Sequence, residues 1–377
     1  MKLHHLLLSF LILSLSTVAM ARTSVLFIGN SFTYGWGSPV RHYRASTVTD
    51  LNNEGIGGVP ALFKSFADQA GLDYDVYLET RGGAGIDFHL ENKLAIIGRR
   101  PFDQVVMHGY STLDAQDPGN PDKLVSTVAA MTDFLRSKNA AVEVYLTATW
   151  SRADQVYLPD KPWTGQPIEN MALDVRAGYD LAAAAPGVAG VNGVGEAWSR
   201  AMASGIADPN PYDGIDLDKV DLWSYDHYHA SHYGYYLEAL VVFGNLTGLD
   251  PRSLGVNECS GYELGMSRTQ IQMLQQAAYD QLASEGRVEA SPLEVDRPGA
   301  ALQLSLRRLF QQQTHQRPAA GHSRGLALIR GSLAPSEAQL SVAQPCAFRV
   351  WPVRVSMGPH NPLGVSGLLT ACHTPDV

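Results

Sequence analysis

The sequence contains few cysteines. Three of its 377 residues are cysteine, at Cys259, Cys346 and Cys372, and no CxxC pair occurs. Three cysteines are too few, and odd in number, to provide a disulfide framework. The lack of CxxC argues against a cysteine-based zinc site. With 45% hydrophobic and 17% charged residues, the composition is that of a globular chain with a substantial buried core.

Basic residues and long hydrophobic runs are also scarce. The formal net charge is −9, with no basic patch and no RNA-binding signature, so nucleic acid is not expected as a partner. The apolar run from Leu6 to Leu15 is far shorter than the roughly 20 residues that span a bilayer. No later apolar run is long enough to cross a bilayer either. Lys2 precedes this run and Ala19-Met20-Ala21 follows it. We therefore predict a signal peptide cleaved after Ala21 and a secreted or periplasmic protein without a membrane span.

Composition changes near residue 290. Residues 297–377 hold eight Arg, two acidic residues and eight Pro, with neither Lys nor Tyr, for a net charge of +6. The preceding 296 residues carry a net charge of −15. Such a change marks a boundary. We divide the chain into a signal peptide (1–21), a main domain (22–290) and an irregular or disordered tail (291–377). A small accessory domain or a reading frame shifted near residue 290 would also explain the tail.

The tail contains a misleading motif. GHSRG at Gly321–Gly325 matches the nucleophile elbow of α/β-hydrolases. That motif requires a buried strand before it and a helix after it, whereas the preceding THQRPAA is polar and contains Pro318. We therefore assign no function to Ser323.

Apolar runs alternate with helical patterns in the main domain. Strands are expected at Ser24–Gly29, Tyr74–Thr80, Phe102–Gly109, Ala141–Trp150 and Val188–Gly195. Helices are expected at Pro60–Gly71, Lys123–Lys138, Glu169–Ala185, Tyr233–Thr247 and Arg268–Glu285. This alternation predicts an α/β fold with a parallel sheet covered on both faces, and ligands beyond the carboxyl ends of its strands. Residues 34–59 and 151–168 are expected to be long loops that shape the site.

Polar residues follow the predicted strands. Ser31 comes after the first strand in IGNSFTYG, and a serine there can attack a carbonyl carbon if a base removes its proton, although a turn or cap is the commoner role. Asp226 and His229 are three residues apart in WSYDHYHASHYGYYLEAL, just before a helix. A carboxylate at that spacing can fix the imidazole tautomer and leave Nε2 facing a nucleophile. A metal site is disfavoured, because neighbouring residues of one turn cannot all converge on one ion.

Three segments together resemble the SGNH/GDSL hydrolase superfamily: FIGNSFT, TRGGAG and DHYHASHYGYYLEAL. The resemblance covers roughly residues 23–285. It implies a flavodoxin-like three-layer α/β/α fold with about five parallel strands. It also implies an esterase, lipase or carbohydrate deacetylase that needs neither metal nor cofactor. By position in the motifs, Ser31 matches the nucleophile, Asp226 and His229 match the rest of the triad, and Gly83 (or Gly82) matches the oxyanion glycine.

One segment departs from the family pattern. MHGYST places Ser111 where the family often has an oxyanion asparagine. The Ser111 hydroxyl could donate the missing hydrogen bond, shared with His108, beside the Ser31 and Gly83 N–H groups.

This departure leaves a second function open, a carbohydrate-binding or catalytically weak protein. Aromatic residues near the motifs favour that alternative: Trp36, Tyr43, Trp150 and Trp163. As the substrate we expect a short-chain ester or an acetylated carbohydrate. The sequence does not indicate the oligomeric state.

Overall fold

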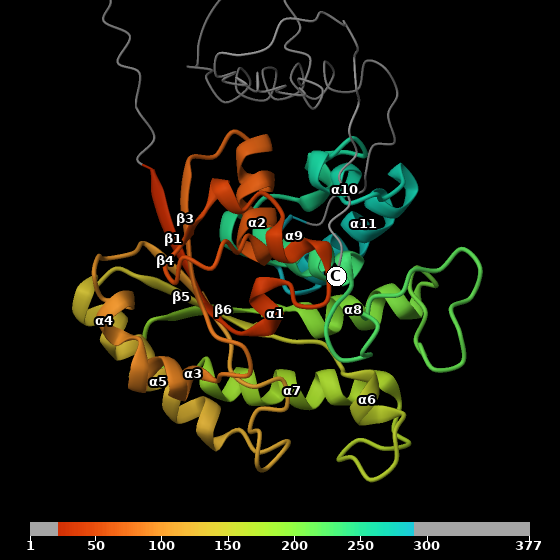
Figure 1. Ribbon diagram of the computed structural model, residues 1–377, viewed down its shortest axis with the longest axis horizontal. Coiled ribbons are helices and arrows are strands. Elements are labelled where there is room, and N and C mark those ends of the chain that lie inside the picture. Colours follow the sequence, from red (N-terminus) through yellow and green to blue (C-terminus); the bar gives the residue numbers. More distant parts are fainter. Residues whose placement is uncertain (1–21, 290–377) are drawn as a thin grey trace, which may run out of the picture. The chain divides into compact units, whose positions relative to one another are not determined.

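A parallel sheet forms the centre of the protein. The computed structural model describes residues 22–289, so the expected signal peptide, the tail from residue 291 and the GHSRG motif lie outside the described residues. In this part of the chain the sheet has six strands in the order β2-β3-β1-β4-β5-β6 (Figure 1). Their bounds are Thr23–Gly29 (β1), Thr49–Asp50 (β2), Tyr74–Thr80 (β3), Gln104–Met107 (β4), Glu143–Ala148 (β5) and Val188–Gly193 (β6).

Helices cover both faces of the sheet, which makes three layers (Figure 1). One face is covered by α2 (Gly58–Gln69), α8 (Val194–Ala203), α9 (His232–Thr247) and α11 (Arg268–Ser284). The other is covered by α3 (Ile86–Asn92), α5 (Asp122–Lys138) and α7 (Ile168–Ala182). Strand β1 contributes Val25 and Phe27 to the first core and Leu26 and Ile28 to the second. This alternation explains why β1 is an unbroken apolar run.

Short helices connect these elements. They are α1 (Ser31–Tyr34), α4 (Leu94–Ile97), α6 (Ala153–Val156) and α10 (Cys259–Glu263), with 3₁₀ turns η1 (Pro39–His42), η2 (Ala45–Thr47) and η3 (Pro251–Leu254).

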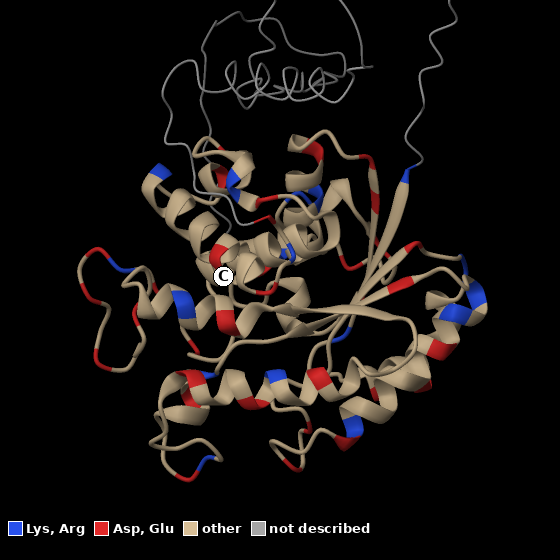
Figure 2. Cartoon of the chain, turned by 180° about the vertical axis from the view of Figure 1, so that it is seen from behind, with Lys and Arg blue, Asp and Glu red and all other residues tan. Residues whose placement is uncertain are grey.

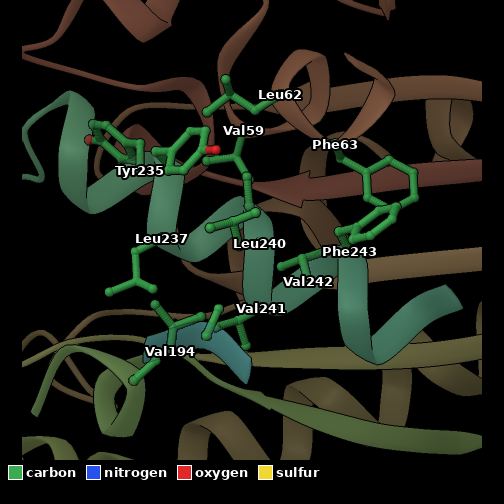
Figure 3. Close-up of a cluster of buried hydrophobic side chains, with 14 of the residues drawn as sticks. Val59, Leu62, Phe63, Val194, Tyr235, Leu237, Leu240, Val241, Val242 and Phe243 are labelled. Carbon is green, nitrogen blue, oxygen red and sulfur yellow. The ribbon is translucent and has the colours of Figure 1, made fainter. Parts of the chain in front are cut away.

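Helix α9 is buried on all sides. Every residue from Gly234 to Leu246 is buried, as expected for a helix that is apolar around its whole circumference. Figure 3 shows Leu240 and Phe243 of this helix with Phe63 of α2. The Ser231 hydroxyl caps its N-terminus by accepting hydrogen bonds from two backbone N–H groups of the first turn. The segment just before α9 is thereby fixed to the core.

Charged residues lie mainly on the outer helices and loops, and strands β1, β4 and β6 contain none (Figure 2). Glu79 of β3 is an exception, because its side chain is fully buried.

The structure confirms the predicted α/β fold and corrects several details. The sheet has six strands rather than five, because residues 34–59 include the two-residue edge strand β2 as well as two 3₁₀ turns. The fifth expected strand, Val188–Gly195, ends at Gly193, and the unpredicted helix α8 begins at once. Its first two residues, Val194 and Gly195, are buried like those of the strand, so hydrophobicity alone does not mark this boundary. The expected strands at 102–109 and 141–150 are each shorter by two residues at both ends.

Candidate active site

The turn between β1 and α1 carries Ser31. Asn30 caps α1, since its Oδ1 accepts a hydrogen bond from the Phe32 N–H at 3.1 Å. The Asn30 Nδ2 donates to the Ala84 carbonyl at 2.8 Å and to the Gly109 carbonyl at 3.3 Å. One side chain thus ties together the loops that follow three adjacent strands, β3, β1 and β4. Asn30 was not among the predicted site residues, although it stands in the motif GNSF.

The structure brings Ser31, His229 and Asp226 together. The Nε2 atom of His229 is 2.9 Å from the Ser31 Oγ, and its Nδ1 atom is 2.6 Å from the Asp226 Oδ2. The other oxygen of Asp226 accepts from the backbone N–H groups of Tyr228 (3.1 Å) and His229 (2.9 Å). Because Asp226 accepts at Nδ1, that nitrogen carries the proton and Nε2 is left as the acceptor for the Ser31 hydroxyl.

Electrostatics favour an ionised aspartate beside a neutral histidine. Burial alone would raise the pKa of Asp226, but hydrogen bonds from the His229 ring and from two backbone N–H groups lower it overall. Burial lowers the pKa of His229 below its usual 6.5, and Asp226 offsets this effect only in part. At neutral pH the imidazole can therefore accept a proton from Ser31.

A closed turn holds Asp226 and His229 in place. The Ser224 N–H donates to the His229 carbonyl at 2.7 Å, and the His227 N–H donates to the Ser224 carbonyl at 2.9 Å. At the ends of this turn, Trp223 and Ala230 form a bridge, and both are buried. The spacing of the motif thus corresponds to a rigid turn anchored on α9.

The other two histidines of this stretch point to different neighbours. The His227 ring lies 4.4 Å from the Tyr212 ring, and the His232 ring lies 4.0 Å from the Tyr233 ring. Among the hydrogen bonds of residues 22–289, Ser31 is bonded to the His229 ring and to neither of these two histidines.

Two backbone N–H groups are available near Ser31. In the part of the chain that the structure describes, the N–H groups of Ser31 and Gly83 donate to no acceptor. Gly83 has φ +71°, which disfavours any side chain, and a Cβ there would meet nothing within 4 Å. Its loop is held against Asn30 through Ala84. This arrangement can present N–H groups to a developing oxyanion.

Ser111 is held by an arginine that sequence reasoning did not single out. The Arg152 Nη1 donates to the Ser111 Oγ at 3.3 Å, and the guanidinium group pairs with both oxygens of Asp154 at 2.9 and 2.6 Å. The guanidinium carbon lies 3.5 Å from the centre of the Tyr228 ring, and that ring is 4.1 Å from the ring of His229. Since arginine only donates, the Ser111 hydroxyl proton stays free for another acceptor.

His108 is already engaged on both sides of its ring. Its Nε2 is 2.7 Å from the Thr33 Oγ1, and its Nδ1 is 3.0 Å from the Gly109 carbonyl oxygen. Burial lowers the pKa of His108 to about 4, so the ring is neutral at pH 7. It donates to Gly109 and accepts from Thr33, which leaves no ring proton for a substrate oxygen.

Residues 22–289 contain neither a metal-binding cluster nor a membrane-spanning helix. They contain no group of three or more His, Cys, Asp or Glu side chains placed to hold a metal ion. None of their helices combines the length and the hydrophobicity needed to cross a bilayer.

Comparison with known proteins gives likenesses at low identity. No protein-family model and no curated protein matches the sequence. The chain is similar to a DUF4886 family protein from Bacteroides uniformis at 15% identity, with 71% of this chain and 97% of that chain covered and a TM-score of 0.49. It is similar to a lipase/acylhydrolase from Enterococcus faecalis at 14% identity (60% and 96% covered, TM-score 0.40). It is also similar to a Clostridium thermocellum family 3 carbohydrate esterase at 16% identity (62% and 98% covered, TM-score 0.40). Identity at this level carries no information on substrate.

The three sequence motifs lie close together in the fold. The GNSF turn follows β1, the Gly83 loop follows β3, and the segment from Asp226 to His229 precedes α9. Hydrogen bonds join these segments at the carboxyl ends of the parallel strands. The chain has a three-layer α/β/α fold, as its resemblance to the SGNH hydrolase superfamily implies.

Proposed function

We propose that the protein is a serine esterase that hydrolyses carboxylic esters of small molecules or acetylated carbohydrates. The observation that carries this proposal is the continuous chain of hydrogen bonds from the Ser31 hydroxyl through His229 to Asp226. A serine beside a neutral, oriented imidazole is an activated nucleophile. Secretion stays a prediction, because residues 1–21 lie outside the described residues.

The reaction uses the two sides of the His229 ring. As the Ser31 Oγ attacks the ester carbonyl carbon, Nε2 takes its proton, and Asp226 stabilises the resulting imidazolium. The N–H groups of Ser31 and Gly83 and the hydroxyl of Ser111 donate to the oxyanion. His229 then gives the proton to the leaving alcohol oxygen, which frees the alcohol and leaves an acyl-enzyme. Water, deprotonated by His229, attacks the acyl carbon, the acid leaves, and Ser31 recovers its proton.

Hydrolysis of p-nitrophenyl acetate tests this proposal. We expect Ser31→Ala to abolish turnover while circular dichroism and thermal unfolding stay as in the wild type. Ser38→Ala is a matched control from the same segment, because Ser38 only caps a 3₁₀ turn. Full activity in the Ser31→Ala variant would disprove the proposal.

The aromatic residues give limited support to the binding-protein alternative. Trp150 and Trp163 are buried, and Trp150 stacks between Phe32 and Trp198, so these two side chains pack the fold. Trp36 is 37% exposed, and its ring lies 6.3 Å from that of His229. We propose Trp36 as an apolar contact for the substrate. A screen of acyl lengths and acetylated polysaccharides, with Ser31→Ala as the blank, would identify the preferred ester.

A further inference from the structure

A buried, hydrogen-bonded pair of a glutamate and a histidine lies outside the triad, against the end of β1. Glu79 of β3 and His89 of α3 are both fully shielded from solvent, and the His89 Nδ1 is hydrogen-bonded to the Glu79 Oε2. The other ring nitrogen, Nε2, is 3.0 Å from the carbonyl oxygen of Gly29. His89 therefore links Glu79 to the peptide unit that leads into Asn30 and Ser31.

The contacts of the His89 ring fix which nitrogen faces Gly29. The second oxygen of Glu79 accepts from Asn52 Nδ2 at 3.1 Å and is 3.3 Å from Lys93 Nζ, so this carboxyl group is held in place on its far side. The Gly29 carbonyl can only accept, so the His89 Nε2 carries a proton and donates it to this oxygen. The Nδ1 atom is joined to the Glu79 Oε2 by a second hydrogen bond, which sets the orientation of the ring.

The Gly29 peptide is held from two directions. Its carbonyl oxygen also accepts from the Arg81 N–H at 3.0 Å. On the other side, a Cβ at Gly29 would lie 2.0 Å from Thr33 Oγ1 and 2.8 Å from His108 Nε2. Only glycine fits there, and the His89 ring donates to the carbonyl of the same peptide unit. The position of the peptide is therefore fixed by these contacts before α1 begins.

We propose that the hydrogen-bonded pair of Glu79 and His89 is a positioning device for the Ser31 turn. The hydrogen bond from His89 to the Gly29 carbonyl holds the start of α1, and with it the Ser31 Oγ, in register with His229. The inference rests on the proposed role of Ser31 as nucleophile. His89 does not touch the reacting atoms and acts through the Gly29 peptide. A misplacement of about 1 Å at a nucleophile can cost roughly 10²-fold in rate.

Three variants distinguish a positioning role of His89 from a general effect on the stability of the protein. His89→Phe keeps a ring but loses both hydrogen bonds, and we expect kcat to fall about 10- to 100-fold with KM within about twofold. His89→Gln retains one donor for the Gly29 carbonyl and should recover part of kcat. Tyr236→Phe is the control, since it removes another buried hydrogen bond to a carboxylate, that to Glu258 at 3.0 Å. It should lower the melting temperature without changing kcat.

Nuclear magnetic resonance of the wild type gives an independent result. We expect a hydrogen-bonded Nε2–H signal from His89, absent in His89→Phe, and changed amide shifts at Gly29 and Asn30 in that variant. The absence of an Nε2–H signal from the wild type, or wild-type kcat in folded His89→Phe, would overturn the inference. If His89→Phe does not fold, Glu79→Gln takes its place, with a lowered kcat expected and an unchanged kcat contradicting the proposal. A wild type without Ser31-dependent hydrolysis would instead overturn the proposed function, and the ring and amide signals would then decide the inference.

Discussion

Replacing Asp226 by asparagine should reverse the tautomer of His229. One carboxylate oxygen accepts two backbone N–H groups at 3.1 and 2.9 Å, and the other accepts the His229 Nδ1–H at 2.6 Å. In the Asp226→Asn variant the amide oxygen is required by the two backbone donors, so the NH₂ group faces Nδ1. Nδ1 then becomes an acceptor, and the proton moves to Nε2, where it blocks transfer from Ser31.

The expected loss is large and confined to catalysis. A wrong tautomer in a triad costs about 10³- to 10⁴-fold in kcat, equivalent to about 4 to 5.5 kcal/mol in the barrier. The backbone hydrogen bonds survive, so the free energy of unfolding should change by no more than about 1 kcal/mol. The assay is kcat for p-nitrophenyl acetate at about pH 7, with urea unfolding alongside. Asp221→Asn is the matched control from the same loop, because among the described contacts the Asp221 side chain accepts only the Trp223 N–H. If Asp226→Asn kept kcat within about tenfold of the wild type, the tautomer argument would be refuted.

Further changes have distinct expected outcomes. Because burial lowers the pKa of His229, kcat/KM should rise with pH around a midpoint below 6.5; a midpoint above that value in the pH–rate profile would contradict the burial argument. Ser111→Ala should lower kcat about 10²-fold, and Ser111→Asn, which keeps a donor, should lower it less; equal losses would exclude the hydroxyl as a donor. His227→Gln should keep normal turnover, because the His227 ring faces Tyr212; an inactive variant would show that His227 takes part in catalysis. Leu240→Ala opens a cavity at a fully buried position of α9 and should lower the free energy of urea unfolding by about 2 to 5 kcal/mol; a loss below about 1 kcal/mol would show that the site collapses.

The sheet could be predicted because its central strands are covered on both faces. Strand β1 contains only apolar residues between Val25 and Ile28, and every one of them is buried. The edge strand β2 has two residues, one of them exposed, and such a short segment shows no period. The start of α8 escaped prediction for the opposite reason, since its first residues are as buried as the strand before it.

Only some residues of the candidate site could be predicted from the sequence. Asp226 and His229 interact within one turn, so their spacing alone indicated a pair. Ser31 lies 198 residues from His229; its place after the first strand made it a candidate nucleophile, and the resemblance joined it to the pair. The role of Arg152 depends on the Ser111 hydroxyl, 41 residues away, and that of His89 on the Gly29 carbonyl, 60 residues away. No local pattern encodes contacts at such separations, and they emerge only when the strands are placed in order.

Covalent labelling of Ser31 tests the central claim most directly. The full-length protein would be treated with an organophosphonate ester that mimics the tetrahedral intermediate, digested, and mapped by mass spectrometry. The proposed mechanism predicts a single adduct on the Ser31 side chain, formed as hydrolysis is lost and absent from the Ser31→Ala variant. An adduct on another residue, or ester hydrolysis that continues while Ser31 stays unlabelled, would contradict it.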